Sequence, residues 1–224
     1  MAVPEAGRVV VATDDPRIAD AAGAFGAEVA MTPESCRNGT ERCAAVADML
    51  GLEHDLIVNL QGDAPLTPPW FVSALIADME ADTETMVATP VLRCDVAALD
   101  GFLEDRRAGR VGGTTAVFDA DRRALYFSKE VLPYTGRPIP SGEAIPVFHH
   151  VGVYAYRRAA LAAYSDLEQR PLETWEGLEQ LRFMEHGIAV RCVEVDGRGR
   201  AFWELNNPSD VERVETMLAQ LGID

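Results

Sequence analysis

The segment Leu56–Leu60 (LIVNL) constrains the fold most, because it is a short and almost wholly apolar run between polar residues. Such a run is typical of a strand that is buried on both faces of a sheet. Similar runs alternate along the chain with stretches of helical periodicity, which predicts an α/β fold with a mostly parallel sheet and helices on both faces. The predicted strands of this sheet cover residues 9–13, 28–32, 56–60, 86–91 and 188–195.

Helices are predicted between these strands, beginning near residues 16, 40 and 68. The charged, glycine-containing stretch at 95–113 is predicted to be a loop with a short helix. A continuous helix is predicted further along by a stripe of large apolar residues at helical spacing. This stripe consists of Leu172, Trp175, Leu178 and Leu181.

The alternation changes after residue 113, where strands are predicted without full helices between them. They cover 114–118, 124–128 and 147–156, and the proline- and glycine-rich stretch at 133–146 is a long loop. A long loop in a compact domain is often a binding or contact surface. We therefore expect one domain over residues 1–224, with a small antiparallel β-rich excursion at about 114–156.

The chain carries 36 acidic and 20 basic residues, a net charge of −16. Nucleic acid would be repelled and meets no basic patch, so it is excluded as a partner. The four cysteines form no CxxC pair, which favours neither a zinc site nor a disulfide framework. No signal peptide and no run of 18 apolar residues is present, so we expect a cytoplasmic protein with no membrane span.

Asp63 follows the strand at 56–60, in the sequence Gln61-Gly62-Asp63. Ligands of open α/β sheets bind outside the carboxyl ends of the strands. A carboxylate at this point is suited to Mg²⁺, which prefers oxygen ligands and bridges phosphates. The alternative is that the segment only reverses the chain in a turn.

Three further groups of polar residues are candidates for binding. The segment 37–42 places a glycine and arginines before a helix N-terminus, where an anion can bind, or it is only a cap with solvated arginines. A strand face shared by His150 and Tyr154 suits a sugar, although a histidine there is commonly structural. Glu176, Glu179 and Gln180 fall on one helix face, where acidic side chains are usually just solvated.

Motifs of several other enzyme classes are absent from the sequence. It has no GxSxG, Walker A, GxGxxG or HExxH segment. This weighs against serine hydrolases, P-loop proteins, dinucleotide-binding enzymes and zinc proteases.

A set of short segments, taken in order, resembles the 3-deoxy-manno-octulosonate (Kdo) cytidylyltransferases, also called CMP-Kdo synthetases. The resemblance covers nearly the whole chain. The segments occur in the same order as in the family, and this combination is more specific than any single segment. It implies a Rossmann-like nucleotidyltransferase fold with a small β-rich dimerisation region. The segments are ATDDPRI (12–18), NGTER (38–42), VNLQGDAPL (58–66), ALYFSK (124–129), HVGVYAYR (150–157) and PLETWEGLEQLR (171–182).

The resemblance implies a reaction in which the anomeric hydroxyl of Kdo attacks the α-phosphate of CTP and pyrophosphate leaves. It implies Mg²⁺ as cofactor, a homodimer, and catalytic parts for Asp63, which binds the metal, and for Lys129, which replaces an arginine near the sugar carboxylate. The implied CTP-binding residues are Ala12, Thr13, Asp14, Gly39, Thr40 and Arg42. The implied sugar-binding residues are Gln61, His150, Tyr154, Glu179 and Gln180.

The chain departs from the family pattern in two places. The family begins with a strand and a basic loop that wraps the triphosphate, and this sequence starts after them, so we expect a shortened chain or a late-start gene model. In addition, the family has an aspartate as second metal ligand where this chain has Asn206. An amide oxygen still ligates Mg²⁺, but it brings no charge.

Three alternatives to a Kdo cytidylyltransferase remain open at this level. The first is a cytidylyltransferase for another acidic sugar, such as a nonulosonate or an amino-Kdo. The second is a non-catalytic protein that binds the nucleotide or the sugar, and the third is a misfolded remnant. Pyrophosphate release would distinguish the enzymes from the binding protein, and aggregation would indicate the remnant.

Overall fold

The protein is described by a computed structural model that covers residues 3–111, 113–136, 139–140, 142–200, 202–205, 208 and 210–222. Its strands are β1 (Val10–Thr13), β2 (Glu28–Met31), β3 (Leu56–Leu60), β4 (Val87–Arg93), β5 (Thr115–Phe118), β6 (Ala124–Ser128), β7 (Phe148–His150), β8 (Val153–Arg157) and β9 (Val190–Val195). Its helices are α1 (Pro16–Ala24), α2 (Gly39–Met49), α3 (Pro69–Ala81), α4 (Val96–Arg107), α5 (Arg158–Tyr164), α6 (Pro171–Glu176), α7 (Gln180–Glu185) and α8 (Asp210–Gln220).

The main sheet is largely antiparallel, and the prediction of a mostly parallel sheet is wrong. β8 lies between β3 and β4 and runs antiparallel to both, whereas β9 pairs with β4 in parallel. β7, β5 and β6 extend the sheet through antiparallel pairs. The strand–helix alternation could not show this insertion, because β8 is wholly buried, and a strand buried on both faces is typical of a parallel sheet.

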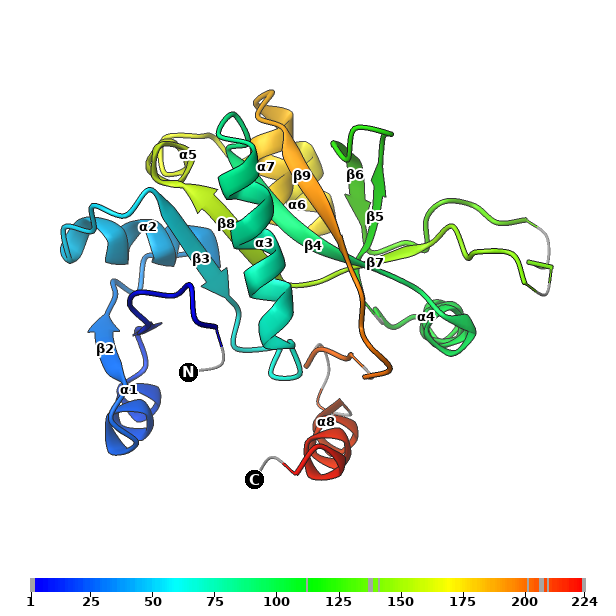
Figure 1. Ribbon diagram of the computed structural model, residues 1–224, viewed down its shortest axis with the longest axis horizontal. Coiled ribbons are helices and arrows are strands. Elements are labelled where there is room, and N and C mark those ends of the chain that lie inside the picture. The colour runs from blue at the N-terminus through cyan, green and yellow to red at the C-terminus, as the bar shows by residue number, and fades with distance from the viewer. Residues whose placement is uncertain are drawn as a thin grey trace.

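β1 and β2 form a separate parallel pair, which lies with α1 to one side of the main sheet (Figure 1). Each strand has only four residues. Asp15 caps α1, because its carboxylate accepts the N–H of Arg17 at 2.8 Å. This small unit is joined to the rest of the structure mainly through α2, which contacts both β1 and β3.

Helices cover both faces of the main sheet, as predicted (Figure 1). Successive residues of β8 alternate between these faces. Tyr154 and Tyr156 pack in a core with α2, α5 and α7, whereas Val153 and Ala155 pack in a second core with α3. A third core, which includes Trp203, lies where α4 and α8 meet the segment before β7.

Three local predictions need correction. The segment at 95–113 holds a helix of 12 residues, because Asp95 caps α4 through the N–H of Ala98 at 2.7 Å. The strand predicted at 147–156 is interrupted between β7 and β8. The helix predicted from Leu172 to Leu181 is two helices, because Gly177 adopts a left-handed backbone (φ 64°) that ends α6. As a result Trp175 is 87% exposed, not buried.

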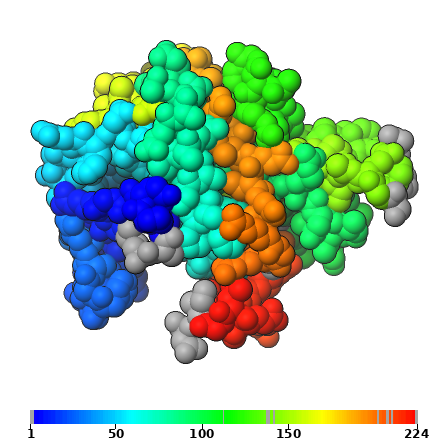
Figure 2. Space-filling view, viewed as in Figure 1, coloured from blue at the N-terminus to red at the C-terminus, as the bar shows by residue number. Residues whose placement is uncertain are grey.

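The described part of the segment between β6 and β7 projects from one end of the molecule (Figure 2). Tyr134 in this segment is 90% exposed. In the described residues, no helix has the length and apolar composition needed to cross a membrane.

Candidate active site

A polar cavity of about 340 Å³ opens where β3 ends, between the start of α2, strand β8 and the turn that joins α6 to α7. This is the carboxyl end of a sheet strand, where ligands of α/β proteins bind. The cavity brings together all five residues predicted to bind the sugar, along with one predicted for the nucleotide and both predicted catalytic residues. These lining residues are Gly39, Gln61, Asp63, Lys129, His150, Tyr154, Glu179 and Gln180.

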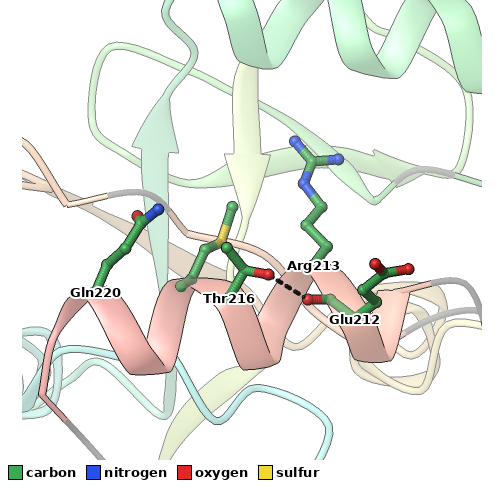
Figure 3. A pocket seen from close by; sticks show the side chains of 5 residues that line it. Glu212, Arg213, Thr216 and Gln220 are labelled. Atoms are coloured by element: carbon green, nitrogen blue, oxygen red, sulfur yellow. Dashed lines mark hydrogen bonds between the residues drawn. The ribbon is translucent and has the colours of Figure 1, made fainter.

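A second hollow, of about 400 Å³, lies along α8 and has a different character (Figure 3). All of its lining side chains come from that one helix, and Thr216 uses its hydroxyl to bond the backbone oxygen of Glu212 at 2.8 Å. A single helix surface cannot enclose a ligand, since enclosure needs walls from several elements. We therefore assign the site to the cavity at β3.

Glu179 connects two sides of the cavity. One carboxylate oxygen accepts the backbone N–H of Thr40 at 2.8 Å, and the other accepts the side-chain amide of Gln61. Burial raises the pKa of Glu179 although both donors favour the charged form. The start of α2, the end of β3 and the start of α7 are thereby held in one arrangement.

Gly39 allows this close approach. A Cβ at this position would lie 2.8 Å from Nδ2 of Asn59 and 3.1 Å from Nε2 of Gln61, closer than real Cβ atoms usually come. Asn38 precedes it as the cap of α2, accepting the N–H of Glu41 at 2.9 Å, and also lines the cavity. Asn38 belongs to the candidate segment 37–42 but was assigned no role of its own from the sequence, although its place before a helix is the signal of a cap.

The back of the cavity is formed by a buried pair, Tyr154 and Gln180. The hydroxyl of Tyr154 donates to Oε1 of Gln180 at 3.0 Å. Among the described residues, Nε2 of Gln180 is buried with no hydrogen-bond partner. An unpaired buried donor is costly in a protein alone, so this amide is a group that a ligand oxygen would satisfy.

His150 lines the same wall and is neutral at physiological pH. Burial lowers its pKa to about 4, and its Nε2 lies 2.9 Å from Oγ1 of Thr89. Since Thr89 also bonds the backbone oxygen of Val153 at 2.8 Å, the ring is fixed by β4 and β8 together. His150 therefore offers the cavity an uncharged ring.

The cavity mouth holds two carboxylates, Asp63 and Glu204. The backbone N–H of Leu205 bonds the backbone oxygen of Asp63 at 2.8 Å, which brings the two segments together. Partial burial raises the pKa of Asp63, and the charge of Glu204 adds to this. Asp63 pairs with no basic side chain in the described part of the chain.

Glu204 was missed by sequence reasoning. Its Oε1 accepts the N–H of Gly152 at 2.9 Å, and its Oε2 lies 3.8 Å from Nε2 of His149. Burial opposes ionisation of Glu204, but His149 and this N–H outweigh it, and its pKa lies below the usual value. The only signal in the sequence was an acidic residue within the apolar stretch at 202–205.

Lys129 is the only lysine of the chain, beside 19 arginines. Among the described residues that line the cavity, it alone carries a permanent positive charge, and its ammonium forms no salt bridge with a described residue. The cavity therefore presents one cation without an ion-pair partner, beside hydroxyl and amide groups and the carboxylates of Asp63, Glu179 and Glu204. This combination suits a polyhydroxylated acid.

The remaining residues predicted for the nucleotide lie beside the cavity, not in its wall. Arg42 donates to Asp14 at 3.1 Å and to the hydroxyl of Thr32, so it ties the ends of β1 and β2 to α2. Ala12 and Thr13 lie at the end of β1 in the same group. The hydroxyl of Thr40 is directed inward to Tyr156, at 2.8 Å. Asn206, predicted as a metal ligand, lies outside the described residues.

Known proteins share the sequence pattern of this chain. A sequence model of the cytidylyltransferases matches residues 2–191. A 3-deoxy-manno-octulosonate cytidylyltransferase of Maricaulis maris is 43% identical over 99% of this chain and 84% of its own length. The mitochondrial enzyme of that name from Arabidopsis thaliana is 34% identical over 95% of this chain and 69% of its own length.

A solved structure supports the same assignment. The CMP:2-keto-3-deoxy-manno-octonic acid synthetase complexed with CTP superposes with a TM-score of 0.79 at 35% identity, covering 98% of this chain and 83% of that one. Fold and sequence thus agree over nearly the whole chain. The chain belongs to the cytidylyltransferase family, and within it to the 3-deoxy-manno-octulosonate cytidylyltransferases.

Proposed function

We propose that this chain transfers CMP from CTP to Kdo and releases pyrophosphate, for lipopolysaccharide biosynthesis. The observation that carries the choice of sugar is the cavity at β3, where the ammonium of Lys129 lies among amide, hydroxyl and carboxylate groups and forms no ion pair with a described residue. A sugar acid matches this set, because its carboxylate pairs with Lys129 and its hydroxyls pair with side chains such as Gln61 and Gln180.

The reaction exchanges one P–O bond for another and releases the proton of the attacking hydroxyl to solvent. The anomeric hydroxyl of Kdo attacks the α-phosphorus of CTP, and the bond from that phosphorus to the oxygen bridging to the β-phosphate breaks. Such transfers need positioning and neutralisation of charge more than covalent help from the protein. Gln61, held by Glu179, and the fixed Tyr154–Gln180 pair would orient the sugar for this attack.

The nucleotide would bind beside the sugar, along the start of α2 and the ends of β1 and β2. Gly39 presents its backbone at the N-terminus of α2, which favours anionic groups, whereas the N–H of Thr40 already donates to Glu179. Arg42 and Asp14, already paired, supply a cation and an acceptor for the nucleotide at the adjoining edge of β1. Ala12 and Thr13 would form the floor of this subsite.

The mouth of the cavity fits a magnesium ion. Mg²⁺ commonly binds one or two protein carboxylates together with substrate phosphates. Asp63 and Glu204 offer two carboxylates whose mutual repulsion a cation would relieve. When bound, the ion would neutralise charge on the phosphates. The chain itself would hold the carboxylates in place through the bond from Leu205 to Asp63.

Pyrophosphate release with CTP, Mg²⁺ and a panel of acidic sugars tests the proposal. We expect turnover with Kdo at least tenfold faster than with a nonulosonate or an amino-Kdo. A faster reaction with another acid would reassign the sugar. Binding of CTP and Kdo without any pyrophosphate would indicate a non-catalytic binding protein.

The homodimer and the cytoplasmic location remain predictions of the family resemblance. Light scattering tests the first, since a dimer has twice the chain mass of 24.3 kDa. Fractionation of cells that express the chain tests the second.

A further inference from the structure

The site's only lysine stands at the exit of a strand. β6 ends at Ser128, and Lys129 is the first residue after it. A long flexible side chain there holds a ligand carboxylate well only if the backbone beneath it is fixed, because a lysine ammonium is a point charge on four rotatable bonds.

Glu176, the last residue of α6, fixes this backbone. Its carboxylate accepts the backbone N–H of Lys129 at 2.9 Å, the hydroxyl of Ser128 at 2.7 Å and the hydroxyl of Tyr126 at 3.2 Å. Ser128 in turn accepts the N–H of Glu130 at 3.0 Å. One carboxylate thus binds donors from both sides of the strand exit.

The next residue, Gly177, leaves room for the lysine head. A Cβ there would lie 3.0 Å from Nζ of Lys129, so the absence of a side chain lets the ammonium lie against the turn between α6 and α7. The same turn ends the helix at Glu176 and begins the approach to Glu179. The break that sequence reasoning missed therefore serves both walls of the cavity.

We propose that Glu176 is a positioning residue for the sugar acid, acting through Lys129. Glu176 is absent from the cavity lining, and both of its carboxylate oxygens are used by protein donors, so it has no direct contact to offer the sugar. It sets where the ammonium meets the substrate carboxylate. The inference rests on the proposed function, because it takes that carboxylate to be the partner of Lys129.

Steady-state kinetics of a graded series test this assignment. Glu176→Ala removes all three bonds and is expected to raise KM for Kdo about tenfold, with KM for CTP within twofold of wild type. Glu176→Gln keeps an oxygen that can accept the N–H of Lys129, so it is expected to restore KM for Kdo to within about threefold of wild type.

Glu185→Ala is the matched control. Glu185 also anchors α6 with its carboxylate, accepting the N–H groups of Leu172 and Glu173, both at 3.0 Å, but at the end of the helix away from Lys129. It is expected to leave both KM values unchanged. An equal rise in KM for Kdo in Glu185→Ala and Glu176→Ala would overturn the proposal, as would an unchanged KM in Glu176→Ala.

The single lysine also gives a spectroscopic test without turnover. Reductive methylation with ¹³C-formaldehyde gives one side-chain dimethylamine signal, from Lys129, and the dimethylated amine keeps its charge. Titration with Kdo is expected to move this signal, with half-saturation about tenfold higher in Glu176→Ala. The same half-saturation in both proteins would overturn the inference.

The two hypotheses fail in different ways. If wild type releases no pyrophosphate with any sugar acid, the proposed function fails, but an altered Lys129 signal in unliganded Glu176→Ala still supports the positioning. If wild type is active and the Lys129 signal of unliganded Glu176→Ala is the same as that of wild type, only the positioning role of Glu176 is contradicted. Should Glu176→Ala not fold, Ser128→Ala removes one of the three bonds, and an unchanged KM for Kdo there overturns the proposal.

Discussion

The cavity at β3 and the β1–β2 unit beside it are built differently, although both carry predicted ligand residues. In the cavity, which lies on a seven-stranded sheet, Glu179 accepts bonds from Thr40 and Gln61, and Tyr154 donates to Gln180. The β1–β2 unit is a two-stranded sheet with large exposed apolar residues, among them Phe25 at 76%. Regions with few buried contacts open at low free energy. We therefore expect the polar groups of the cavity to be held more firmly before a ligand binds than those of the β1–β2 unit, even though Arg42 bonds Asp14 and Thr32 there.

The comparison implies a division of labour. Prearranged groups lower the barrier of a reaction, because no reorganisation is needed at the moment of transfer. Groups on a loosely held unit contribute to ligand affinity, but ordering that unit on binding offsets part of the binding free energy. We therefore expect changes at the cavity to act on turnover, and changes at the β1–β2 unit to act on nucleotide binding.

The largest effect is expected for Asp63→Ala at the mouth of the cavity. Removal of a carboxylate that would hold the metal on the phosphates should lower kcat by about 10³-fold or more. Pyrophosphate release at saturating CTP and Kdo measures this. Undiminished synthesis in the variant would contradict both the expectation that the cavity governs turnover and the proposed metal site.

His150 tests whether the cavity wall is dry and rigid. Its pKa of about 4 in the folded protein lies below the ordinary value near 6.5, so the unfolded chain binds the proton more readily. The stability that neutral His150 contributes is complete above pH 6.5 and is lost as the pH falls toward 4. Over that range the loss amounts to roughly 3 kcal/mol.

Denaturant unfolding of wild type and His150→Gln at pH 7 and pH 4 measures this loss. The variant has no imidazole to titrate at this position. The difference in unfolding free energy between the two proteins should therefore shift by about 3 kcal/mol in favour of the variant at the lower pH. A difference that is independent of pH would show that the wall admits water.

Gly39 stands at the junction of the two regions, and Gly39→Ala should disturb both. The new methyl group would displace the side chains of Asn59 and Gln61, and kcat/KM should fall about tenfold. Gly23→Ala is the control, since a Cβ there meets nothing within 4 Å and Ala favours the helix α1. Equal activity of the two variants would mean that the junction tolerates movement.

Much of the cavity followed from local sequence signals. The buried strand before Gln61 and Asp63 fixed the edge of the sheet at which they lie, and the cap before Gly39 fixed the start of α2. These signals suffice because a strand end and a helix start are properties of neighbouring residues. The polar residues that follow such signals were therefore located correctly relative to the sheet.

What escaped prediction depends on contacts between distant segments. β8 enters between β3 and β4 from almost 100 residues further along the chain than β3, and only its pairing reveals its direction. Glu204 reaches the mouth because Leu205 bonds the loop after β3. Gly177 ends a helix that the apolar spacing alone would continue. Its left-handed backbone conformation depends on contacts with distant segments as well as on its own lack of a side chain.

The smallest effect is expected for Asp14→Asn in the β1–β2 unit. Its ion pair with Arg42 is partly exposed, with side-chain exposures of 34% and 21%, and such pairs contribute less than about 1 kcal/mol. Stability and kcat should hardly change, whereas KM for CTP should rise severalfold because Arg42 loses its charged partner. Kinetics with each substrate varied in turn measure this split. A fall in kcat with KM for CTP unchanged would instead mean that the β1–β2 unit is as prearranged as the cavity, since only a group already in place acts on the transition state alone.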